Sequence, residues 1–193
     1  MTRILGAFDA LARASVWAGG ALLLAASAFI GLEVLLRKAF SVSINGATEL
    51  STYVLAVSTA FAFAYALFRK AHIRVDVLYV RLPDRAKAAL DVLSLLMLLA
   101  FTVPLSYYAY GVASTSLQRG STANTPLQTP LWVPQGLWFL GLAVFTTVIA
   151  LMLIATVAAL ARGRLAEAQA LAGATTLEEE VEEESGIRMD QAS

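Results

Sequence analysis

Four long apolar stretches dominate the chain, and short polar segments separate them. They cover about residues 14–36, 48–68, 88–110 and 132–160. Windows of about twenty residues with few charges are typical of helices that cross a lipid bilayer. The pattern therefore predicts an all-α integral membrane protein with four transmembrane helices.

The polar segment between the second and third stretches, residues 69–87, has a periodicity of its own. Four apolar residues lie three or four positions apart and would share one face of a helix: Val75, Leu78, Tyr79 and Leu82. Pro83 follows directly and should end this helix, because its backbone nitrogen carries no hydrogen to donate. We expect a short helix here, lying in the membrane interface between spans 2 and 3.

The composition supports a membrane protein and removes several chemistries. The chain is 59% hydrophobic and 15% charged, whereas soluble domains are about 45–50% apolar and about 25% charged. There is no Cys, so disulfides and thiolate metal sites are excluded. His72 is the single histidine, which excludes histidine clusters that bind zinc and two-histidine haem ligation.

The formal net charge of zero conceals an uneven distribution. Residues 1–160 hold eleven Lys and Arg against six acids, and residues 161–193 hold three against eight. We therefore expect three parts: a short N-terminal segment (1–13), the four-helix domain (14–160), and an acidic tail (161–193) that is weakly helical or disordered.

Orientation follows from the positive charges. Eleven of the fourteen Lys and Arg lie in the N-terminal segment, in 69–87 or after the fourth span. Cytoplasmic loops are enriched in these residues. Both termini and the 69–87 segment are therefore expected in the cytoplasm, with Arg37, Lys38 and Arg119 on the opposite side.

Two acids near the ends of spans have alternative interpretations. Glu33 precedes Arg37 by four residues, the favourable order for a helical ion pair; alternatively, it carries protons, because ionisable groups inside spans often mark ion pathways. Glu49 begins the second span, where a carboxylate suits the positive end of the helix dipole. Alternatively, Glu49 contacts a partner.

Two linkers complete the pattern. Residues 39–47 are short and contain Asn45-Gly46, a turn-forming pair, so the first two spans should be antiparallel neighbours. Residues 111–130 are rich in Ser, Thr, Gly and Pro and predict a longer loop on the side opposite 69–87. Such a loop is either a solvated connector or a functional surface.

No catalytic motif is visible. The chain lacks a P-loop, a Gly-x-Ser-x-Gly elbow and a His-Glu-x-x-His zinc motif. Glu33, Glu49 and Asp91 all map to span ends, whereas carriers usually place ionisable groups near the membrane centre. We expect no enzyme, no cofactor in this chain and no nucleic-acid partner. By elimination, we expect a scaffold or partner subunit. The alternative is an autonomous proton-coupled carrier of small solutes that acts as a homo-oligomer through Glu33.

Four motifs then suggest a family. In order, they are Arg37 at the end of span one, Glu49-Leu50 opening span two, Arg69-Lys70-Ala71-His72-Ile73-Arg74-Val75-Asp76, and Thr125-Pro126-Leu127 to Pro130-Leu131-Trp132-Val133-Pro134-Gln135. In this order among four spans, they resemble the small membrane subunit of tripartite ATP-independent periplasmic (TRAP) transporters. The resemblance covers roughly residues 14–160.

The resemblance implies a bacterial inner-membrane complex of three proteins. A periplasmic solute-binding protein would deliver organic acids, and a large membrane subunit would bind the substrate and sodium. The small subunit would brace the large one in the lipid membrane and help dock the binding protein. The motif positions carried over, with structural or partner-facing roles, are Arg37, Glu49, Arg69, His72, Arg74 and Asp76.

Overall fold

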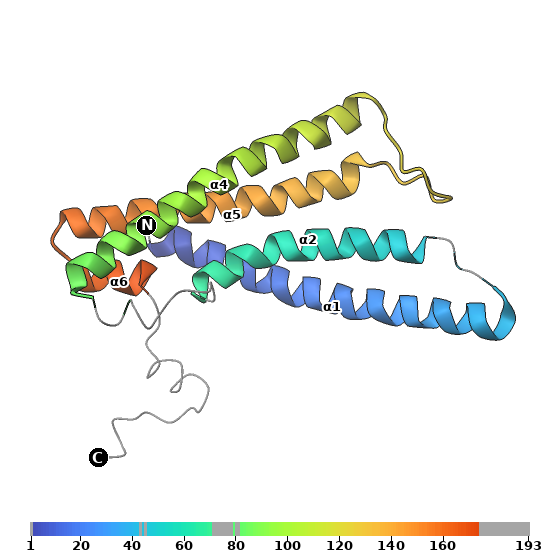
Figure 1. Ribbon diagram of the computed structural model, residues 1–193, viewed down its shortest axis with the longest axis horizontal. Helices are drawn as coiled ribbons and strands as arrows, with labels where there is room; N and C mark the ends of the chain where they lie inside the picture. The colour runs from blue at the N-terminus through green and yellow to red at the C-terminus, as the bar shows by residue number, and fades with distance from the viewer. Residues whose placement is uncertain (1, 43, 45, 71–78, 80–81, 174–193) are drawn as a thin grey trace, which may run out of the picture.

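Helices account for nearly all of the regular structure. The computed structural model describes residues 2–42, 44, 46–70, 79 and 82–173 (Figure 1). The helices in these ranges are α1 (Thr2–Phe40), α2 (Ala47–Phe68), α4 (Asp84–Gln118), α5 (Trp132–Ala161) and α6 (Leu165–Ala172). Four of them, α1, α2, α4 and α5, are long and apolar enough to cross a membrane. This confirms the predicted all-α membrane fold. The expected interfacial helix lies outside the described residues, apart from Tyr79 and Leu82.

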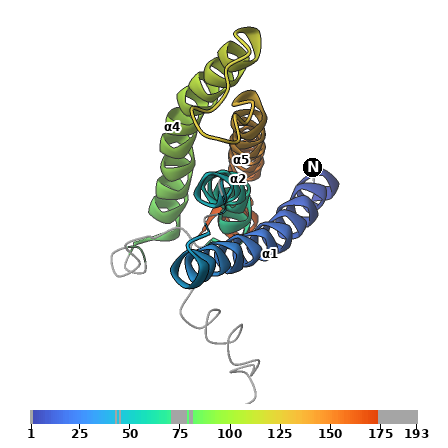
Figure 2. The ribbon, with the colours of Figure 1, turned by 90° about the vertical axis from the view of Figure 1, so that its right-hand side faces the viewer.

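The four long helices are arranged in a single layer. In Figure 2 they follow one another in the order α1, α2, α5, α4, with α1 and α4 at the two edges. α2 packs against both α1 and α5, and α4 packs against α5. Two ends can be distinguished: the N-terminal end holds the N-terminus and α6, and the hairpin end holds the α1–α2 and α4–α5 connections (Figure 1).

Small residues let α2 approach both of its neighbours. On the α1 side, a Cβ added to Gly19 would lie 3.0 Å from Ser58 Cβ, and Ser58 Oγ donates a 3.4 Å hydrogen bond to the Gly19 carbonyl. On the α5 side, a Cβ on Gly141 would lie 2.8 Å from Ala60 Cβ. Close backbone approach of this kind stabilises helix pairs in lipid, where no hydrophobic force drives them together.

A shared core at the N-terminal end joins all five helices. Its buried members are Ala12, Ala64, Leu67, Leu95, Phe145, Val148, Ile149, Met152 and Ala172. α6 turns back from the end of α5 and packs on α4 and α5. Its Gln169 Nε2 donates a 3.5 Å hydrogen bond to the Asp84 carbonyl at the start of α4. The helices are therefore fixed together mainly at this end.

The helices are longer than the apolar stretches predicted. α1 begins at Thr2, so most of the predicted N-terminal segment is helical. α4 continues to Gln118, so the expected loop 111–130 starts eight residues later than predicted. Polar residues in this last part are tolerated because their hydroxyls bond back to the helix, as Ser114 Oγ does to the Gly111 carbonyl (3.0 Å). Gly120 (φ +57°) follows the helix end.

The start of the predicted tail adopts the helical one of its two alternatives. Residues 165–172 form α6. This stretch, LAEAQALA, consists of strong helix formers, and its Ala168 and Ala172 are buried against the neighbouring helices. Local propensity and packing therefore agree on a helix, whereas the acid-rich composition of the whole tail favoured disorder.

Candidate functional site

The hairpin end brings together segments that are far apart in the sequence. The α4–α5 loop, residues 119–131, is a short hairpin closed by a bridge between Thr122 and Pro130. Two hydrogen bonds hold it: Ala123 N to the Thr129 carbonyl (2.9 Å) and Leu131 N to the Ser121 carbonyl (3.0 Å). This loop is therefore an ordered element, and it extends past the ends of α4 and α5 (Figure 1).

Glu49 is the polar centre of this region. It lies in the first turn of α2, where Tyr53 Oη donates a 2.9 Å hydrogen bond to Glu49 Oε1. The hydroxyls of Thr125 and Thr129, from the loop, lie against the same carboxylate. Glu49 Oε2 and Thr125 Oγ1 are both buried, and neither forms a regular hydrogen bond within the described residues. Glu49 therefore lies in an intramolecular contact between α2 and the loop.

An apolar contact reinforces this polar one. Gly46 is in the left-handed region (φ +93°) directly before α2, and the loop residue Leu127 occupies the space where a side chain would stand. We call these residues the loop clasp: Gly46, Glu49, Tyr53, Thr125, Leu127 and Thr129. The clasp connects the α1–α2 hairpin to the α4–α5 loop. It therefore links the two helix hairpins of the layer at the hairpin end.

Glu33 and Arg37 form the ion pair that their spacing predicted. Arg37 Nη2 donates to Glu33 Oε1 one helical turn earlier. Glu33 is only 3% exposed, whereas the Arg37 side chain is 58% exposed. An exposed guanidinium at the end of a span can reach the headgroup region while its partner stays within the protein. The arrangement agrees with the predicted ion pair between Glu33 and Arg37.

At the N-terminal end, Arg69 and Asp91 have defined contacts. The Arg69 guanidinium lies 5.2 Å from the centre of the Tyr65 ring, a cation–π geometry. Asp91 is 2% exposed and accepts a 2.8 Å hydrogen bond from Tyr79 Oη. Three of the predicted motif residues, His72, Arg74 and Asp76, lie outside the described residues.

The Tyr79–Asp91 contact was not foreseen from the sequence. The sequence predicts Tyr79 on the apolar face of the interfacial helix, and Asp91 lies four residues after Lys87, a spacing that allows an ion pair between them. Lys87 instead lies 3.6 Å from Asp84, with its ammonium 5.9 Å from the centre of the Tyr79 ring. The available signal was the Tyr79 hydroxyl, since a tyrosine on an otherwise aliphatic face usually finds a hydrogen-bond partner.

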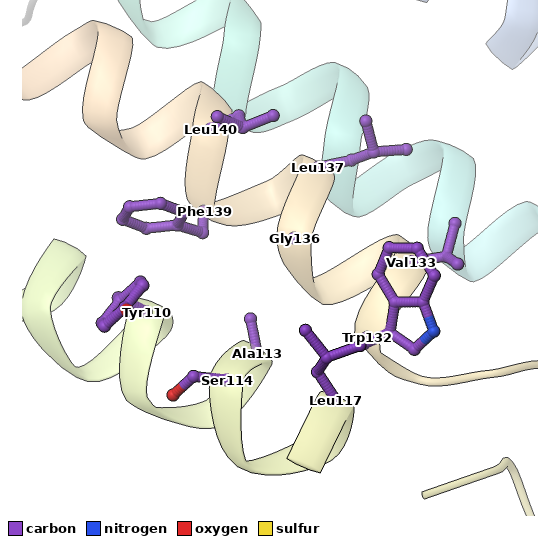
Figure 3. A pocket seen from close by; sticks show the side chains of 10 residues that line it. All are labelled: Tyr110, Ala113, Ser114, Leu117, Trp132, Val133, Gly136, Leu137, Phe139 and Leu140. Carbon is purple, nitrogen blue, oxygen red and sulfur yellow. The ribbon is translucent and has the colours of Figure 1, made fainter. Parts of the chain in front are cut away.

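An apolar groove of about 420 Å³ separates α4 from α5 near the hairpin end (Figure 3). Tyr110, Ala113 and Ser114 of α4 face Trp132, Gly136 and Phe139 of α5 across it. Space remains open at Gly136, where an added Cβ would meet nothing within 4 Å. In the described ranges, no group of three or more acids or histidines could hold a metal ion. The groove therefore offers mainly apolar surface for packing.

A known family model matches most of the chain. The profile described as "Tripartite ATP-independent periplasmic transporters, DctQ component" matches residues 26–163. This range contains the loop clasp, the Glu33–Arg37 pair and the groove, and it leaves out most of the acidic tail. The match confirms the resemblance noted in the sequence motifs. No curated protein and no solved structure matches the chain.

Proposed function

We propose that this chain, which belongs to the DctQ component family of the tripartite ATP-independent periplasmic transporters, is a scaffold that braces a large membrane subunit. Membership makes the chain a small membrane component of a TRAP transporter. Sodium coupling and recognition of organic acids would then belong to the large subunit. The complex would lie in a bacterial inner membrane, with the N-terminal end of this chain facing the cytoplasm.

The single-layer arrangement is the observation that carries this proposal. A layer has two broad faces and cannot enclose a path for a solute within one chain. Its edge helices expose large apolar side chains, including Trp17 (78%) and Leu24 (75%) on α1 and Phe101 (67%) on α4. Exposed apolar side chains of this kind can contact either lipid or a membrane partner. A layer in addition offers a partner a long, continuous contact surface.

The position of the acids supports the same function. In the described parts of the spans, Glu33 and Glu49 lie towards the hairpin end and Asp91 towards the N-terminal end. Carriers usually concentrate ionisable groups near the centre of the membrane. A scaffold needs none there, because its role is to hold a neighbour in place.

Docking of the solute-binding protein would occur at the hairpin end. The positive-inside distribution favours the periplasm for this end. There the loop clasp holds 119–131 as a projecting element, and Leu127 (43% exposed) and Trp132 (44%) are accessible on it or beside it. An ordered loop costs less entropy on binding than a flexible one, so the clasp would present a prepared surface.

Cysteine crosslinking tests the scaffold function directly, because the chain has no native Cys. The chain is co-expressed with its large membrane subunit, and single cysteines are placed at Trp17, Leu24 or Phe101. We expect co-purification in mild detergent and crosslinks to the large subunit from one edge. Ala64→Cys, at a buried position in the layer, is the matched control and should give none. Failure to recover any complex, with the chain folded, would overturn the proposal.

The autonomous carrier remains the second candidate because of one observation. Glu33 is almost fully buried inside a candidate span, as expected of a proton-carrying group. The carrier hypothesis predicts that this chain alone moves a solute across the membrane and that Glu33→Gln abolishes the movement. The ion pair with Arg37 and the open layer both argue against it.

A further inference from the structure

The path of α6 fixes the place from which the acidic tail leaves the layer. α6 turns back towards α4, and its last residue, Ala172, is buried in the core shared with Ala12 and Leu67. Gly173 N then donates a 2.7 Å hydrogen bond to the Gln169 carbonyl. The chain beyond Gly173 therefore begins at the N-terminal end, beside the last turn of α2 and the first turn of α4.

Four cations lie close in the sequence to these contacts. Arg69 and Lys70 lie two and three residues after Leu67, Arg85 follows Asp84, whose carbonyl accepts the hydrogen bond from Gln169, and Arg162 precedes α6. In the described part of the chain, none of these four cations forms an ion pair. The acids close to them are committed elsewhere: Asp84 pairs with Lys87 (3.6 Å) and Glu167 with Arg164 (3.2 Å). We refer to Arg69, Lys70, Arg85 and Arg162 as the cationic rim.

The tail carries the complementary charge. Residues 174–193 contain seven acids and one arginine, a net charge of −6, and the rest of the chain has a net charge of +6. Six of the acids form two blocks, Glu178–Glu180 and Glu182–Glu184. From Gly173 to Glu178 the chain spans at most roughly 17 Å, at up to about 3.5 Å per residue. Both blocks can therefore reach the rim.

We propose that the two glutamate blocks dock on the cationic rim and act as an intramolecular counter-charge. Tethering favours this contact, because a segment attached a few residues away has an effective concentration in the millimolar range. Clusters of Lys and Arg beside a span otherwise attract anionic lipid headgroups or acidic partners. A docked tail occupies the rim and competes with such ligands. This inference concerns the tail and the N-terminal end alone, so it does not depend on the scaffold function.

A distance measurement tests the proposal. Two cysteines are introduced, Ala161→Cys beside the rim and Ser185→Cys after the second block, and spin labels are attached in the full chain. The distance between the labels is measured by double electron–electron resonance in nanodiscs of zwitterionic lipid. At roughly 0.05 M salt we expect one short, narrow distribution, and at about 1 M salt, where the Debye length is only about 3 Å, a long, broad one.

Matched variants separate the rim from general charge effects. Arg85→Gln with Arg162→Gln removes two rim charges and should abolish most of the short-distance population. Lys38→Gln with Arg119→Gln removes two charges from the hairpin end and should leave the distribution unchanged. Replacing the six glutamates by glutamine should have the same effect as the rim variant. A broad distance distribution at low salt would overturn the proposal, and so would equal effects of the two pairs of charge substitutions. Displacement of the tail by anionic lipid in the wild-type chain would support the rim as the binding surface.

Discussion

Leu127 fills the space that a side chain at residue 46 would need: a Cβ on Gly46 would lie 2.1 Å from Leu127 Cδ1. The two residues are far apart in the chain, and their contact links the α1–α2 hairpin to the α4–α5 loop. Gly46 also requires a positive φ (+93°), which glycine adopts without strain. A larger residue at this position would therefore strain the backbone and displace the Leu127 side chain.

Gly46→Ala should therefore loosen the clasp and destabilise the chain. The left-handed backbone costs an alanine about 1–2 kcal/mol, and the clash with Leu127 adds roughly 1–3 kcal/mol. Thermal unfolding in detergent and protease cleavage within 119–131 measure the effect. Gly120→Ala is the control, since Gly120 has a positive φ (+57°) but open space around it. If both variants lose equal stability, the Leu127 contact contributes nothing.

Glu49→Gln should weaken the hold of the loop and reduce substrate uptake by the assembled transporter. The amide keeps the shape of the carboxylate but lacks its charge, so its hydrogen bond from Tyr53 is weaker. Tyr53→Phe removes the same 2.9 Å bond from the other side and should cost roughly 1 kcal/mol. Uptake is measured in cells alongside the amount of chain in the membrane. Normal uptake in Glu49→Gln at normal abundance would reduce Glu49 to a helix-dipole role.

Gly141→Ala should separate α2 from α5. The new methyl group would lie 2.8 Å from Ala60 Cβ and 3.0 Å from the Ala60 carbonyl carbon, so a backbone has to move, at roughly 1–3 kcal/mol. Gly136→Ala, on the same helix but facing open space, should be neutral or stabilising by up to about 1 kcal/mol. Thermal unfolding of both variants decides this, and Ala60→Gly should partly rescue Gly141→Ala. Equal stability of the two alanine variants would contradict the close packing.

Tyr79→Phe should free the connection between α2 and α4. The 2.8 Å hydrogen bond from Tyr79 to the buried Asp91 carboxylate is charge-assisted, and such bonds contribute about 1.5–3 kcal/mol. Hydrogen exchange and protease cleavage around Tyr79 should rise without a change in membrane insertion. Tyr107→Phe, at an exposed position (71%), is the control. An unchanged exchange rate in Tyr79→Phe would show that this hydrogen bond does not hold the connection in place.

Much of the fold was predictable from the sequence because each span is a long apolar run with few charges. The Asn45-Gly46 turn correctly indicated the α1–α2 hairpin, and the spacing of Glu33 and Arg37 correctly indicated their pair. Composition predicted the wrong boundaries at the helix ends. The Ser- and Thr-rich stretch after Tyr110 looks like a loop, yet the Ser114 hydroxyl bonds back to the α4 backbone and the helix continues to Gln118.

The single layer and the loop clasp could not be predicted. The α5 sequence, WVPQGLWFLGLAVFTTVIALMLIATVAALA, is apolar on all sides, so no face of it indicates which neighbour it contacts. The clasp depends on residues far apart in the sequence, Glu49 and Thr125, whose meeting follows from the helix order. Only α5 running beside α2, with their first turns at the same end, brings the loop over Glu49.

Flux through the purified chain alone is the most direct test of the account. The chain is reconstituted into liposomes without partners, and uptake of labelled dicarboxylates and 2-oxo acids is measured under sodium and proton gradients. The scaffold predicts no uptake above empty liposomes, and uptake by the full complex that persists in Glu33→Gln. Gradient-driven uptake by the chain alone, abolished by Glu33→Gln, would contradict it.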